Sequence, residues 1–170
     1  MTAARNTVVA VAVLAAIVLQ AALVPHLSWR GVVPNLVLLV VIAGALTRGA
    51  YTGVVLGFCA GLALDLAPPS DHVVGRWALA LLVVGYLAGS VRRDERPTVP
   101  VVLVTAAVAS FVGSSVFALL GVVLSDPGVP VLDVLGAVGA GVLSDIVLAP
   151  LVLLPMLLLL TRLEPQRRLL

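Results

Sequence analysis

Charged residues are almost confined to short breaks between long apolar runs, and this placement constrains the chain more than any other feature. Only 11% of the 170 residues are charged and 62% are hydrophobic, whereas a soluble domain carries about 25% charged and about 45–50% apolar residues. Lipid must therefore solvate this chain. Because a membrane-spanning helix needs about 20 apolar residues, we predict an all-α integral membrane protein built as a bundle of transmembrane helices.

The apolar runs between the charges predict six spans in a single membrane domain. Their approximate bounds are 6–25, 32–47, 49–65, 75–91, 99–124 and 136–161. Six spans use about 120 residues and leave only short loops and tails, with no room for a soluble catalytic domain. Several runs are short for a bilayer, so we expect their flanking charged side chains to lie at the membrane interface.

The arginines predict the orientation of these spans, because short cytoplasmic loops carry an excess of basic residues. With the N-terminus inside, Arg30 and Arg76 fall in outer loops. The cytoplasmic segments would hold Arg5, Arg48, Arg92, Arg93, Arg96, Arg162, Arg167 and Arg168. This asymmetry predicts that both termini are cytoplasmic and that the number of spans is even.

Four glycines recur at every fourth position of the third run, followed by an acid at the same spacing. They are Gly49, Gly53, Gly57 and Gly61, and the acid is Asp65. Residues four apart lie on one ridge of a helix, so the glycines form a groove that another helix can approach closely. Such ridges are typical of helix packing in lipid. Packing within the bundle, contact with a partner's helix and a substrate-lining surface all remain open for this ridge.

Two acids interrupt or end apolar runs and are candidates for a functional role by default. Asp65 would lie at the outer end of the third helix, within reach of water, and Asp145 would lie inside the sixth helix. Arg30 and Arg76 are the outer-side arginines that could meet either acid. Gln20 could bond to a neighbouring helix. A structural ion pair or polar cap, a partner contact and proton or ligand handling remain open for the acids.

The chain lacks the residue sets that catalysis or metal binding needs. It has one cysteine, Cys59, within an apolar run, and no His or Cys cluster, phosphate loop or Ser-His-acid set. A net charge of +2, without a basic stripe, does not indicate nucleic-acid binding. We therefore expect no enzyme, no cofactor, no metal site and no small-molecule substrate.

Several short motifs together resemble the family of the rod shape-determining protein MreD. The third run contains Gly53-x-x-x-Gly57-Phe58-x-x-Gly61-Leu62-x-x-Asp65, and the fourth contains Gly75-x-x-Ala78-Leu79 and Val84-Gly85-Tyr86. The first run contains Leu19-Gln20, and Pro34-Asn35-Leu36 opens the second helix. The resemblance covers residues 19 to 90, and the later half matches only in hydropathy and length. Two departures are the Pro68-Pro69 pair and Arg76, which occupies a place that is usually apolar.

The resemblance implies a non-enzymatic, multi-pass subunit of the cell-elongation complex in the bacterial cytoplasmic membrane. Its partners would be MreC, MreB, RodA and a penicillin-binding transpeptidase, with a role in lateral peptidoglycan synthesis and cell shape. The family is also similar in fold to the substrate-binding subunits of energy-coupling-factor transporters. A vitamin-binding subunit of that kind is the alternative, and a small proton-coupled carrier relying on Asp145 is a third hypothesis.

Overall fold

The computed structural model describes residues 2–27, 34–68, 73–91, 98–124 and 131–163, and the regular secondary structure within these residues is entirely helical. The helices are α1 (Thr2–Leu27), α2 (Leu36–Arg48), α3 (Ala50–Leu66), α4 (Arg76–Ser90), α5 (Val99–Val123) and α6 (Val131–Arg162). The prediction of an all-α protein is confirmed for this part of the chain. Each helix overlaps one of the apolar runs.

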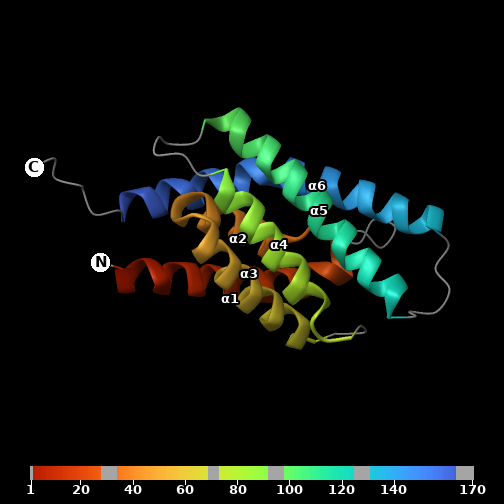
Figure 1. Cartoon of the computed structure of the whole chain (residues 1–170). Coiled ribbons are helices and arrows are strands. Elements are labelled where there is room, and N and C mark those ends of the chain that lie inside the picture. The colour runs from red at the N-terminus through yellow and green to blue at the C-terminus, as the bar shows by residue number, and fades with distance from the viewer. Residues whose placement is uncertain (1, 28–33, 69–72, 92–97, 125–130, 164–170) are drawn as a thin grey trace, which may run out of the picture.

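Helix α2 lies at the centre of the bundle and contacts each of the other five helices (Figure 1). Every residue from Leu36 to Thr47 is buried, as expected for a helix that is apolar on all sides. The side chains that surround it include Val9 and Val13 of α1, Leu81 and Val84 of α4, and Leu153 and Leu160 of α6. The core of the molecule therefore surrounds its shortest helix.

The start of α2 is set by Asn35 rather than by the proline before it. The Asn35 side chain accepts a hydrogen bond from the backbone N–H of Leu38 at 2.9 Å, which satisfies a donor that a helix N-terminus leaves unpaired. The helix begins at Leu36. Pro34 thus precedes the helix and does not form its first turn, contrary to the sequence-based expectation.

Successive helices run in alternating directions. The start of α1, the turn between α2 and α3, and the end of α6 lie at one end of the bundle (Figure 1). Among the described residues, three segments are long and apolar enough to cross a membrane: Ala4–Ala22, Val99–Val123 and Leu135–Arg162. The 13 residues of α2 cover only about 20 Å, less than the roughly 30 Å of a hydrocarbon core. Six crossings therefore stay a prediction.

Candidate functional site

The glycine ridge of α3 lies directly against α4 over its whole length. A Cβ atom at Gly57 would lie 2.0 Å from the carbonyl oxygen of Leu81, and one at Gly53 would lie 2.2 Å from that of Gly85. At Gly61 the nearest atom would be the carbonyl oxygen of Trp77, at 2.3 Å. Because these neighbours are backbone atoms, no side chain can fit at the three positions. Among the roles left open for the ridge, this geometry corresponds to packing within the chain.

Gly49 has a different place from the other three glycines. It precedes α3 and has a φ of 89°, in the left-handed region that residues with a side chain rarely adopt. It closes the turn between α2 and α3, and its N–H donates to the carbonyl oxygen of Ala45 at 2.8 Å. The four-residue spacing suggested that Gly49 is the first residue of the helical ridge. The structure instead places Gly49 in the turn before α3.

Asp65 continues the ridge by one turn and caps the N-terminus of α4. Its Oδ2 accepts hydrogen bonds from the backbone N–H groups of Gly75 at 2.8 Å and Ala78 at 3.1 Å, and its Oδ1 accepts one from Trp77 at 3.1 Å. The residue before α4 is Gly75, which has no side chain to cap its own helix. A carboxylate there also interacts favourably with the helix dipole.

The expected exposure of Asp65 to water is wrong, because the side chain is 0% exposed. The glycines bring α3 and α4 so close that the carboxylate at the end of the ridge lies beneath the first turn of α4. The residues from Gly53 to Asp65 therefore act together. The glycines let α4 approach α3 closely, and Asp65 holds the start of α4 by hydrogen bonds. Among the roles considered for Asp65, these contacts correspond to a polar cap.

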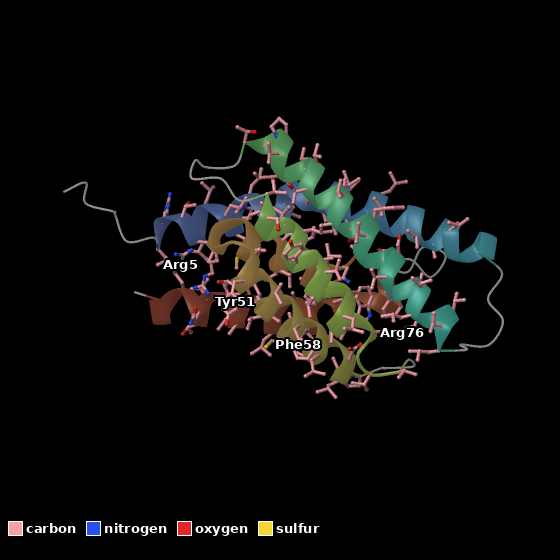
Figure 2. All side chains as sticks on the ribbon, in the orientation of Figure 1. Arg5, Tyr51, Phe58 and Arg76 are labelled. Carbon is pink, nitrogen blue, oxygen red and sulfur yellow. The ribbon has the colours of Figure 1, made fainter. Side chains whose placement is uncertain are left out.

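Arg76 joins the first turn of α4 to α5. It is only 6% exposed, its guanidinium carbon lies 4.1 Å from the centre of the Phe117 ring, and its Nη2 donates to the Phe117 carbonyl oxygen at 3.2 Å. Trp77 stacks on the same ring, with 4.2 Å between the ring centroids. Gly121 gives the guanidinium room, because a Cβ there would lie 2.3 Å from Nη2. Figure 2 shows Arg76 beside α5.

Asp145 joins three helices in the centre of the bundle. It is 2% exposed, its Oδ1 accepts a hydrogen bond from the backbone N–H of Asn35 at 2.7 Å, and its Oδ2 accepts one from the Ser110 hydroxyl at 2.5 Å. The carboxylate thus connects the start of α2 and the middle of α5 to α6. Within the described residues its partners are an amide and a hydroxyl, not the arginine that the sequence suggested.

Two residues of this cluster were missed as functional candidates. Ser110 was not among the candidates named from the sequence, and Asn35 was noted only as part of a helix start. The Nδ2 of Asn35 is buried and has no hydrogen-bond partner among the residues that the structure describes. Asn35 and Asp145 are 110 positions apart, so no local pattern could have paired them.

The first half of α6 contrasts with the crowded α3 ridge. None of its residues from 135 to 144 is buried, and a Cβ added at Gly136, Gly139 or Gly141 would meet nothing within 4 Å. Opposite the buried Asp145, this helix presents what we call the α6 outer face: Gly136, Gly139, Ala140, Leu143 and Val147. Figure 1 shows this half of α6 extending past the rest of the bundle.

The remaining candidates contribute no chemical site within the described residues. Gln20 is half-buried, and its Oε1 finds no hydrogen-bond partner among the residues whose structure is described, so its bond to another helix stays a prediction. Cys59 is a free, exposed thiol. In the same part of the chain, no group of three or more His, Cys, Asp or Glu residues could hold a metal ion.

These features describe a protein of apolar helices whose polar side chains serve to join one helix to another. Comparison with family models places it more closely, because the model of the rod shape-determining protein MreD matches residues 2–163. The chain belongs to the MreD family and is a rod shape-determining membrane protein. No curated protein and no solved structure matches it, so the similarity in fold to transporter subunits stays a prediction.

Proposed function

We propose that this protein is a non-enzymatic, multi-pass subunit of the bacterial cell-elongation complex and acts in the cytoplasmic membrane. The observation that carries the proposal is the family match over residues 2–163, which takes in all six described helices. Because the match takes in the six helices, we infer that the protein acts through contacts made by their surfaces. The alternating directions of the helices and the three segments long enough to span a membrane support the multi-pass topology.

Within this function, the α6 outer face contacts a membrane segment of MreC. Small residues let helix backbones approach closely, and this packing replaces the hydrophobic driving force that lipid does not supply. The glycines of α3 cannot serve in this way because α4 already occupies their groove. The glycines of α6 have open space in front of them. RodA, the penicillin-binding transpeptidase and MreB would then join the same complex through MreC or through the remaining helix surfaces.

The proposal is tested by filling the open face without touching the core. The double variant Gly136→Leu/Gly139→Leu places two large side chains where nothing lies within 4 Å, so the protein should fold and insert. We expect it to lose co-purification with MreC and to give rounded cells when it replaces the wild-type protein. The matched control is Ala15→Leu, at an exposed position of α1, which should keep both. Full co-purification and rod shape in the double variant would refute this contact surface.

A further inference from the structure

An apolar groove lies between α1 and α3, away from the surfaces considered above. Helix α1 packs mainly against α2, and the space left beside α3 has a volume of about 500 Å³. The groove is lined by Val9, Ala10, Val13 and Leu14 of α1 and by Val55, Leu56, Cys59 and Ala60 of α3. It is open to the side of the bundle, where a membrane protein meets lipid.

The polar lining of this groove is concentrated at one end. Asn6 and Thr52 line it there, together with Arg48 from the last turn of α2. Arg5 precedes Asn6 in the chain, and burial together with the nearby positive charge of Arg5 lowers the pKa of Arg48. Figure 2 shows Arg5 and Tyr51 at this end of the bundle, with Phe58 farther along α3. The groove therefore combines a basic end with an apolar length.

Charge is distributed unequally between the two ends of the described structure. The end of α6, which carries Arg162, lies at the same end of the bundle as the start of α1 and the end of α2, which carry Arg5 and Arg48 (Figure 1). At the opposite end, the end of α3 carries Asp65 and the start of α4 carries Arg76 (Figure 2), while Asp145 lies in the centre of the bundle. By the positive-inside rule the basic end faces the cytoplasm, where the membrane surface is rich in anionic lipids.

We propose that the groove binds one anionic phospholipid, with its phosphate between Arg5 and Arg48 and an acyl chain along α1 and α3. The apolar stretch from Asn6 to Leu14 is about 12 Å long at about 1.5 Å per residue. This length suits part of an acyl chain, and the basic residues at the end of the groove suit an anionic headgroup. Basic pockets between helices on the cytoplasmic side are typical sites for anionic headgroups.

The single cysteine makes occupancy measurable in the unmodified chain. Cys59 is exposed and lines the groove, so a bound acyl chain should slow its reaction with a maleimide. The experiment uses the full chain in a nonionic detergent and adds phosphatidylglycerol or phosphatidylcholine with identical acyl chains. We expect phosphatidylglycerol to protect the thiol at concentrations at which phosphatidylcholine does not.

Two variants separate the headgroup from the acyl chain, each with a matched control. Arg48→Gln should weaken phosphatidylglycerol binding about fivefold, the effect of one arginine near an anionic headgroup, whereas Arg162→Gln, outside the groove lining, should not. Ala10→Phe fills the groove and should abolish phosphatidylglycerol binding measured by native mass spectrometry. Ala15→Phe, at an exposed α1 position that does not line the groove, should leave it intact.

Three outcomes would overturn the proposal. Equal protection of Cys59 by both lipids would show that the arginines do not select the headgroup, and no protection by either would show that the groove stays empty of lipid. Protection that appears only when MreC is present would assign the groove to a partner's helix. Since the first two readouts use the wild-type chain, misfolding of a variant cannot hide the answer.

Discussion

Two glycine-rich segments of this protein have opposite surroundings. In α3, the glycines lie against the backbone of α4, and a Cβ atom at any of the three helical positions would lie within 2.3 Å of a carbonyl oxygen. In the first half of α6, a Cβ atom at Gly136, Gly139 or Gly141 would meet nothing within 4 Å. The residue type is the same, but within the part of the chain that the structure describes only the first segment has a packing partner.

The difference teaches that a small-residue ridge indicates close approach without indicating what approaches. In α3 the ridge ends in Asp65, which bonds to three N–H groups at the start of α4, so the acid identifies the partner helix. In α6 the acid that follows the open segment, Asp145, faces the core. Gly136 and Gly139 face the other way, and we assign them to a helix from another protein.

The largest effect should follow from adding a single methyl group to the crowded ridge. Gly57→Ala puts a Cβ atom 2.0 Å from the Leu81 carbonyl oxygen, and backbone atoms cannot move aside as a flexible side chain can. We expect a loss of about 3 kcal/mol in the free energy of unfolding, at the upper end of overpacking costs. Denaturant titration in mixed micelles measures it. Unchanged stability would mean that α3 and α4 are not this close.

Removing the cap at the end of the ridge should cost somewhat less. Asp65→Ala leaves the N–H groups of Gly75, Trp77 and Ala78 without their side-chain acceptor, and we expect a loss of about 2 kcal/mol. Asp65→Asn keeps one oxygen and should lose less. The same titration measures both variants, and the prediction fails if alanine and asparagine are both neutral.

A smaller loss of stability is expected at Asp145. A substitution there also distinguishes a role in connecting helices from a role in proton handling. Asp145→Asn can still accept from the Asn35 N–H and bond to Ser110. We therefore expect a loss of about 1 kcal/mol in the free energy of unfolding, within the range of interhelical hydrogen bonds in membranes. Rod shape should be retained. Loss of rod shape in a variant that remains folded would instead favour the proton-coupled carrier.

The smallest effect should come from the counterpart of the first substitution. Gly139→Ala adds the same methyl group where there is open space, and alanine favours a helix over glycine by up to about 1 kcal/mol. We expect stability between unchanged and about 1 kcal/mol higher. A loss comparable with that of Gly57→Ala would mean that this part of α6 is packed within the chain, and the comparison between the two segments would then fail.

The positions of the helices could be predicted because they depend on local chemistry. Charged residues cannot be placed cheaply in lipid, so the breaks between apolar runs mark the ends of helices. The errors occur where a particular side chain or backbone angle sets the end. The hydrogen bond accepted by the Asn35 side chain starts α2 after Pro34. Gly49 has a positive φ and lies in the turn before α3, outside the helix.

The contacts of the acids could be predicted only in part. The four-residue spacing placed Asp65 on the ridge of Gly53, Gly57 and Gly61, but its burial depends on how closely α4 approaches. The cluster around Asp145 brings together residues from α2, α5 and α6, and hydropathy carries no information about pairs so distant in sequence. The glycines of α6 lie three and two residues apart, unlike the four-residue spacing of α3. Neither spacing says what lies beside the helix, so the openness of α6 needed the structure.

The central claim, that the α6 outer face meets the membrane segment of MreC, is tested most directly by photo-crosslinking in cells. A photoreactive amino acid would replace Leu143 on this face or, as a control, Val18 on α1, whose exposed fractions are 66% and 69%. We predict a crosslink to MreC from position 143 and none from position 18. Equal crosslinking from both positions, or crosslinking from position 18 alone, would contradict the account.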